Sequence, residues 1–159
     1  MKDHHKIKGF WILVALTLVS LLFTNVPLTP KYGMETTNTK ITFRSIGTAQ
    51  NILLDDNPSF TTPTLLPLRE PIPLEPGTYY WKTTGMSLVT TFTILSHTAL
   101  TIEQKEDNYE VSNKGNVPLD IETKQEGLLT GSFVINTKGK LQLQLDKETE
   151  IKGVQRNEK

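Results

Sequence analysis

The residues of this chain best suited to binding a metal ion lie in one acidic turn, Asp55-Asp56-Asn57. Oxygen ligands from such a turn suit Ca²⁺, but Ca²⁺ takes about six to eight oxygens. The glycine and final glutamate of an EF-hand loop do not follow the turn. Asp and Asn side chains also accept hydrogen bonds from their own backbone in turns. We therefore expect these side chains to cap the turn and not to hold a metal.

Groups for catalysis are sparse. His4 and His5 stand in a short polar flank, and His97 is isolated between two strand-rich segments. The sequence contains no nucleophile elbow, no phosphate-binding glycine loop and no His-Glu-x-x-His motif. The absence of cysteine removes thiol nucleophiles and thiolate metal ligands. A formal net charge of +0 supplies no field for nucleic acid. The sequence predicts a protein that is not an enzyme and has no cofactor, metal or nucleic-acid partner.

An aromatic cluster, Tyr79-Tyr80-Trp81, follows a Pro-Gly corner in the stretch PLEPGTYYWKTTG. Exposed tyrosine and tryptophan rings can stack on sugars, so the cluster is a candidate glycan site. In a strand the same residues would fill a core, because Pro76 fixes the bend, Gly77 frees it, and aromatic residues suit a half-buried pleated surface. We favour the core, with an inward face made of Tyr79, Trp81 and Thr83. The opposite phase of the strand stays open.

The N-terminal region contains an apolar stretch, residues 9–26, without an ionisable side chain. At about 1.5 Å per residue, a helix of this length nearly spans the ~30 Å hydrocarbon core of a bilayer. Residues 1–8 carry three lysines against one aspartate, which predicts a cytoplasmic tail and export of the rest. We expect a transmembrane helix in contact with membrane lipid. A cleaved signal peptide is the alternative, although the stretch is longer than the usual ~7–15 apolar residues and no small-x-small site follows.

Lys8-Gly9-Phe10, before the apolar stretch, resembles the processing site of type IV prepilins, which implies pilin-like assembly. The resemblance is incomplete. Those proteins usually carry a glutamate where this chain has Val14, and their helix continues where this chain has Pro27.

The rest of the chain reads as short strands separated by turns. Residues 27–39 combine proline, glycine, threonine and asparagine without periodicity and are expected to be a spacer. We predict an all-β fold after the transmembrane helix, with one or two small sandwich modules at 40–96 and 97–155 and a disordered tail at 156–159. A single sandwich with an extended sheet remains open. In the second module we expect a hairpin closed at Lys138-Gly139.

The stretch DDNPSFTTP, followed by PLEPGTYYWKTTG, resembles the fibronectin type III-like modules of prokaryotic surface proteins. The resemblance implies that Leu74 and Tyr80 form the corner that enters a strand, with the Tyr80 hydroxyl bonded back to the main chain. Thr83 departs from the family pattern, which has an apolar β-branched residue at this position.

A second stretch, VSNKGNVPLDIE, resembles immunoglobulin-like domains of archaeal and bacterial surface proteins. The resemblance implies that Asn113, Gly115 and Asn116 make a tight turn and that Leu119 returns to the core. Together, the anchor, spacer and modules resemble membrane-anchored surface proteins of prokaryotes, archaea especially, whose activity the fold does not imply.

By elimination, we predict a non-catalytic structural or protein-interaction role at the cell surface, with another envelope protein as partner. Residues 140–146 alternate leucine with the polar residues Lys140, Gln142 and Gln144. A free edge of such a strand accepts another strand by β-augmentation. The alternative is that this strand is paired with residues 132–136 and its other edge is covered. A carbohydrate-binding module and a pilin-like subunit stay open as other functions.

Overall fold

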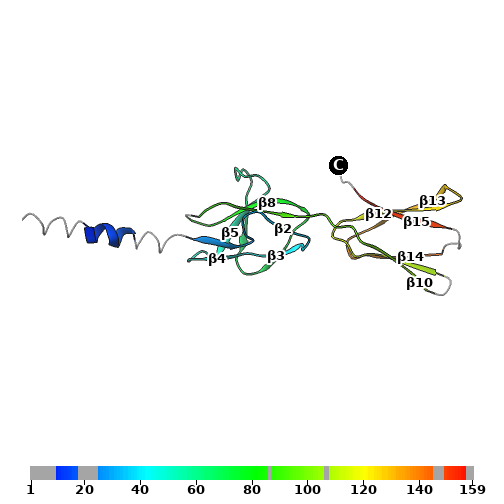
Figure 1. Ribbon diagram of the computed structural model, residues 1–159, viewed down its shortest axis with the longest axis horizontal. Helices are drawn as coiled ribbons and strands as arrows, with labels where there is room; N and C mark the ends of the chain where they lie inside the picture. Colours follow the sequence, from blue (N-terminus) through cyan, green and yellow to red (C-terminus); the bar gives the residue numbers. More distant parts are fainter. Residues whose placement is uncertain (1–9, 18–24, 86, 106–107, 145–148, 157–159) are drawn as a thin grey trace, which may run out of the picture. The chain divides into compact units, whose positions relative to one another are not determined.

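The computed structural model describes residues 10–17, 25–85, 87–105, 108–144 and 149–156 (Figure 1). The fold is all-β: apart from a helical segment at 10–17, the regular structure of these residues consists of strands. The chain divides into two compact units. Unit 1 comprises Met1–Met34, Lys40–Pro73 and Thr78–Thr93, and unit 2 comprises Glu35–Thr39, Leu74–Gly77 and Ile94–Lys159.

The first nine strands form three sheets. The largest has the order β2-β9-β8-β5-β6, and two antiparallel pairs, β1-β4 and β3-β7, accompany it. The strands are β1 (Val26–Thr29), β2 (Met34–Thr36), β3 (Lys40–Thr42), β4 (Arg44–Ile46), β5 (Asn51–Asp55), β6 (Thr64–Pro67), β7 (Pro71–Pro73), β8 (Gly77–Thr83) and β9 (Thr90–Ile94).

The rings of three aromatic residues, Phe43, Trp81 and Phe92, form the centre of the core of unit 1. The ring of Phe43 packs edge-on against Trp81, with centroids 5.1 Å apart, and against Phe92, with centroids 5.9 Å apart. Such edge-to-face pairs contribute about 0.5–1.5 kcal/mol each beyond their burial. Ile52 and Leu54 reach the same core because alternate residues of β5 face one side of the sheet.

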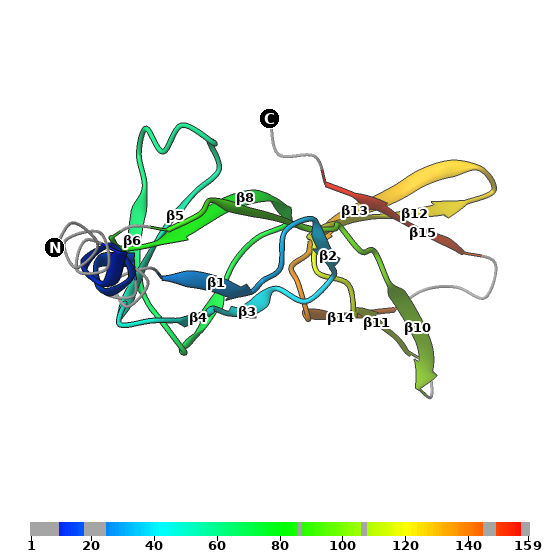
Figure 2. The same cartoon turned by 60° about the vertical axis from the view of Figure 1, so that its left-hand side comes forward.

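Unit 2 contains two three-stranded antiparallel sheets with the orders β10-β11-β14 and β13-β12-β15. Figure 2 shows β12, β13 and β15 side by side. The strands are β10 (Leu100–Lys105), β11 (Asn108–Asn113), β12 (Leu119–Gln125), β13 (Leu128–Ile135), β14 (Lys140–Leu143) and β15 (Glu150–Gln155). The core between the sheets is aliphatic and consists of Val111, Leu119, Ile121, Ile135 and Leu143.

The N-terminal prediction needs correction at its end. Asn25, placed in the membrane helix by the prediction, is buried and bridges to Ser87, and Val26 begins β1. Helical structure is described for residues 10–17, whereas residues 1–9 and 18–24 of the predicted tail and span lie outside the described residues. Among the helical residues that are described, none form a segment long and apolar enough to cross a membrane.

The predicted spacer, residues 27–39, carries most of β1 and all of β2. Both strands are very short, so they show no periodicity in the sequence, and their pairing partners lie far along the chain. The Pro30 carbonyl also accepts a hydrogen bond of 3.2 Å from the Trp81 indole N–H, which ties this segment to the aromatic core. In the predicted tail, the backbone N–H of Arg156 donates to the Pro118 carbonyl, and residues 157–159 lie outside the described residues.

The hairpin predicted at Lys138-Gly139 is wrong. A turn does form there, since the Gly139 N–H donates to the Asn136 carbonyl at 2.8 Å. However, β13 before the turn pairs with β12, and β14 after it pairs with β11. The chain thus crosses from one sheet to the other. Turn chemistry and alternation are the same for a hairpin and for this crossing, so local sequence does not distinguish them.

Candidate functional site

Of the cluster Tyr79-Tyr80-Trp81, Trp81 lies in the core, and Tyr79 packs against a core ring. The side chains of Trp81 and Thr83 are fully buried, and the Tyr79 ring stacks on Phe92 with centroids 5.6 Å apart. Tyr80 points to the opposite side of β8 and is half-buried. The Trp81 ring is therefore not accessible for stacking on a sugar, and the candidate glycan site lacks an exposed tryptophan.

The acidic turn is capped internally. One carboxylate oxygen of Asp55 accepts the Asn57 N–H at 3.1 Å, and the other accepts the Thr62 N–H at 3.0 Å. Partial burial alone would raise the Asp55 pKa, but these N–H donors outweigh it and hold the pKa below its usual value. Both carboxylate oxygens of Asp55 therefore cap the turn. No cluster of three or more potential metal ligands occurs in the described part of the chain.

Asn113 has a structural role at the end of β11. Its side chain is buried, its amide N–H₂ donates to the carbonyls of Val117 (2.8 Å) and Ile135 (3.3 Å), and its carbonyl oxygen accepts the Gly115 N–H at 2.9 Å. Only glycine fits at position 115, because a Cβ there would collide with the His97 carbonyl oxygen. The turn is thus held by one side chain inside unit 2.

Asn116 connects three segments of unit 2. Its amide N–H₂ donates to the carbonyls of Thr37 (2.9 Å) and Leu95 (2.8 Å), while its oxygen accepts the His97 N–H at 2.6 Å. Leu119, the next residue of the predicted motif, is buried in the aliphatic core. These bonds explain why two asparagines and a glycine occur here without implying a binding site.

The predicted corner residues also lie within the fold. Leu74 is partly buried, and its N–H donates to the Thr39 carbonyl at 2.8 Å. Pro76 is partly buried, and Gly77 begins β8. No hydrogen bond of the Tyr80 hydroxyl is recorded among residues 25–85 or the other described ranges.

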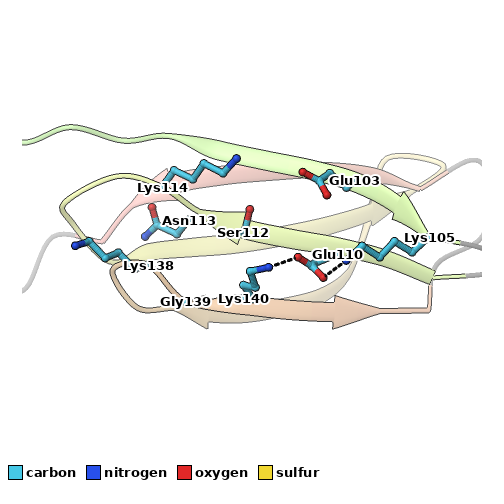
Figure 3. Close-up of a pocket in the computed structure, with 9 residues that line it drawn as sticks. All are labelled: Glu103, Lys105, Glu110, Ser112, Asn113, Lys114, Lys138, Gly139 and Lys140. Atoms are coloured by element: carbon cyan, nitrogen blue, oxygen red, sulfur yellow. Dashed lines mark hydrogen bonds and ion pairs between the residues drawn. The ribbon is translucent and has the colours of Figure 1, made fainter.

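The outer face of the sheet β10-β11-β14 carries a cluster of charges (Figure 3). Lys105 and Lys140 approach the two carboxylate oxygens of Glu110, each with an N–O distance of 2.6 Å. The Glu110 side chain is 11% exposed, against 56% for Lys105 and 66% for Lys140. Hydrogen bonds from Lys105 and then Lys140, opposed by burial, lower the Glu110 pKa to about 2. The same bond raises the Lys105 pKa. We call these three residues the Glu110 cluster.

Two shallow hollows flank the Glu110 cluster. One, of about 410 Å³, extends towards Ser112, Lys114 and Lys138, and the other, of about 470 Å³, extends towards Asn108 and Gln142. Every titratable group that lines them is a lysine or a glutamate, and the Glu110 pKa of about 2 keeps that carboxylate ionised. A permanently charged carboxylate is a poor general base near neutral pH.

Sequence reasoning missed the Glu110 cluster because it depends on strand register. Ser112 pairs with Lys140 and Glu110 with Gln142, which places Lys140 diagonally across from Glu110. Lys105 reaches Glu110 from β10 within the same sheet. The alternation of residues 108–113 indicated an outward Glu110, but only the order of strands shows which lysines surround it.

The free edge of β14 adjoins this charged face. β14 pairs with β11 on one side, and none of the described strands pairs with its other side. By alternation, Lys140 and Gln142 point outward with Glu110, whereas Leu141 and Leu143 point to the core. Gln144, the third predicted edge residue, follows directly and is exposed.

Three other edge strands, β6, β10 and β13, carry features that discourage pairing. β6 ends in Pro67, β10 carries Glu103 and Lys105, and the pairing of β13 shifts register near its Thr130. Proline, charge and bulges are the usual means by which proteins protect edges. On β14 only Lys140 is charged, and it is paired with Glu110, which also binds Lys105. Among these edges, β14 is the best suited to accept a strand.

Comparisons with known proteins add little to this description. No protein-family model and no curated protein matches the chain. A crystal structure of native alpha-2-macroglobulin from Escherichia coli spanning domains NIE-MG1 is similar, with a TM-score of 0.33 and 10% identity over 84% of this chain and 92% of that chain. A second, spanning domains MG0-NIE-MG1, has a TM-score of 0.30 and 9% identity over 84% of this chain and 64% of that chain. At these values the likeness identifies neither a family nor an activity.

Proposed function

We propose that this protein is a non-catalytic β-sandwich protein of the cell surface with a structural or protein-interaction role. In this proposal β14 accepts a strand from a protein partner in the envelope. Main-chain hydrogen bonds supply the attraction, and the alternating side chains of β14 select the partner. The resemblance of the sequence to prokaryotic surface modules supports the location, and the absence of catalytic motifs supports the lack of chemistry.

The single observation that carries the proposal is the unpaired side of β14. Its backbone N–H and C=O groups have no partner strand among the described residues, and unpaired edges are templates for pairing with another chain. Nothing comparable is offered by the aromatic cluster or the acidic turn, since their side chains are occupied by the core and by the backbone.

Photo-crosslinking on intact cells tests this interaction. A photoreactive amino acid at Gln142, on the free edge, is expected to capture a specific protein. The matched control is the same amino acid at Glu122, which points outward from β12 between β13 and β15. Equal capture at both positions, or none at Gln142, would contradict a role for this edge.

Anchoring by the apolar N-terminal stretch belongs to the same proposal. The lysines at the N-terminus and the absence of ionisable side chains in residues 9–24 support a cytoplasmic end and an exported sandwich. Protease added to intact cells is expected to remove the epitopes of residues 40–156 and to spare a tag at the N-terminus. Release of the sandwich into the medium without residues 1–24 would instead support a cleaved signal peptide.

A further inference from the structure

The free edge of β14 is complementary to itself. Read around Gln142, the sequence Lys140-Leu-Gln-Leu-Gln144 places leucine on either side of the central glutamine and a polar residue at each end. An antiparallel pair of identical strands about a two-fold axis requires such a pattern, because residue i of one copy faces residue j of the other and j faces i. We propose that the strand accepted by β14 is β14 of a second copy of this chain. This inference rests on the proposed function and names its partner.

The register follows from the side-chain pattern. With the two-fold axis at Gln142, this residue faces its own copy, Leu141 faces Leu143, and Lys140 faces Gln144. The leucines of both copies then point towards the two cores, where Leu143 is buried and Leu141 packs partly buried in each copy. A register shifted by one residue would set leucine opposite polar side chains and place it on the wrong face. Registers centred on Leu141 or Leu143 would also keep the leucines facing the cores, but among residues 140–144 only the register centred on Gln142 pairs both leucines of each copy with leucine.

Charge does not oppose pairing of β14 with a second copy of itself. Each Lys140 is paired within its own copy with Glu110 at 2.6 Å, although Glu110 also pairs with Lys105. In the proposed register, the two Lys140 residues are four positions apart along the strands, about 13 Å at ~3.3 Å per residue, so they do not repel closely. The remaining polar positions, Gln142 and Gln144, carry no charge, and facing amides hydrogen-bond to each other.

Apolar exposure on the same side of the sandwich supports pairing there. A Cβ placed on Gly153 of β15 would lie 3.1 Å from Leu100 of β10, so β15 and β10 face each other across the core. Because both sheets have three strands, β13 must face β14 on the opposite side. Phe133, on the core-facing side of β13, is 37% exposed there. A second copy at β14 would shield Phe133 and Leu141 from water.

Cysteine crosslinking of the full-length chain in mild detergent tests the pairing and its register, since the protein has no cysteine of its own. Under mild oxidation, Gln142→Cys is expected to form a disulfide-linked dimer, because directly opposite Cβ atoms lie about 4.5–5.5 Å apart. Lys140→Cys alone and Gln144→Cys alone should stay monomeric. Mixing differently tagged Lys140→Cys and Gln144→Cys chains should give the mixed dimer. Glu122→Cys is the matched control on a central strand.

A second variant works without oxidation. Gln142→Lys sets two lysines opposite each other at the axis and should weaken the dimer about tenfold or more in light scattering, whereas Glu122→Lys should not. Equal crosslinking of Gln142→Cys and Glu122→Cys would overturn self-pairing. An unlinked monomer in every case would also overturn it, provided that the mixture of Gln142→Cys and Gln144→Cys chains, which a register centred on Leu143 would link, stays unlinked as well. If the photoreactive group at Gln142 then captures a different protein on cells, the edge keeps its proposed function and only the second copy is excluded. If it captures nothing, both proposals fail.

Discussion

Units 1 and 2 are both built of strands but are held together by different side chains. In unit 1, the rings of Phe43, Trp81 and Phe92 fill the core, and the main polar tie to it is the indole bond to Pro30. In unit 2, the core is aliphatic, and a buried asparagine, Asn113, holds the turn after β11. The packing of large rings thus defines the structure of unit 1, whereas directed hydrogen bonds from a buried side chain help to define that of unit 2.

The difference extends to the carboxylates. Asp55 in unit 1 is bonded by backbone N–H groups of its own turn, whereas Glu110 in unit 2 is bonded by two lysine side chains from neighbouring strands. A locally capped carboxylate stabilises one loop. A carboxylate paired across three strands instead depends on the order of the sheet, and one of its lysines, Lys140, lies on the free edge of β14.

The largest expected effect is that of Trp81→Ala. Removing a fully buried indole from a core should lower the free energy of unfolding by about 3–5 kcal/mol. Chemical denaturation followed by circular dichroism measures the loss, and Trp81→Phe, which keeps a ring, should lose less. In NMR spectra, signals of Val111 and Ile121 should keep their folded positions. If they shift with those of unit 1, the two units do not behave as separate cores.

Asn113→Ala is expected to have the next largest effect, and on unit 2. The substitution leaves the buried carbonyls of Val117 and Ile135 and the Gly115 N–H without their partner, which should cost about 2 kcal/mol. Asn136→Ala is the control, since the exposed Asn136 takes part in these bonds through its backbone carbonyl. Equal free energies of unfolding for the two variants would mean that the side-chain hydrogen bonds of Asn113 do not stabilise unit 2.

The Glu110 cluster predicts a dependence on pH. Because the Glu110 pKa falls from 4.5 to about 2 on folding, its contribution is complete above about pH 4.5 and is lost as the pH falls towards 2. In Glu110→Gln, the free energy of unfolding should therefore fall less steeply as the pH is lowered from about 4.5 to 2. Chemical denaturation at a series of pH values measures this dependence. Glu122→Gln removes an outward carboxylate of β12 and serves as control. An unchanged slope in Glu110→Gln would show that the lysines do not hold the ionised form.

Much of the fold was accessible from the sequence because it depends on short-range patterns. The all-β class follows from alternation and turn residues, and the burial of Trp81 agrees with the alternation of residues 79–83. Leu119 and Ile121 alternate with Asp120 and Glu122, and this pattern gave the buried face of β12. In each case, a period of two residues contains the information.

What the sequence could not supply depends on long-range partners. The strands before and after Lys138-Gly139 have the composition of a hairpin, yet each pairs in a different sheet. The strand at Met34–Thr36 is too short to show a period and forms only because β9 provides its neighbour. The Glu110 cluster likewise required the register of β11 and β14. These features depend on the pairing of strands that are distant in the sequence, and local residue propensities do not predict such pairing.

The smallest expected effect is that of Tyr80→Phe, which tests whether Tyr80 makes the hydrogen bond that the fibronectin type III-like resemblance implies. That resemblance implies a Tyr80 hydroxyl bonded to the main chain, but no such bond is recorded among the described residues, and Tyr80 is half-buried on the face of β8 opposite Trp81. Tyr80→Phe should therefore change the free energy of unfolding by less than about 0.5 kcal/mol. Tyr80→Ala should cost more, because the half-buried ring is lost with the hydroxyl. Thermal denaturation of both variants beside the wild type gives the comparison. A loss of about 1 kcal/mol or more in Tyr80→Phe would mean that the hydroxyl has a hydrogen-bond partner in solution, as the resemblance to the family implies.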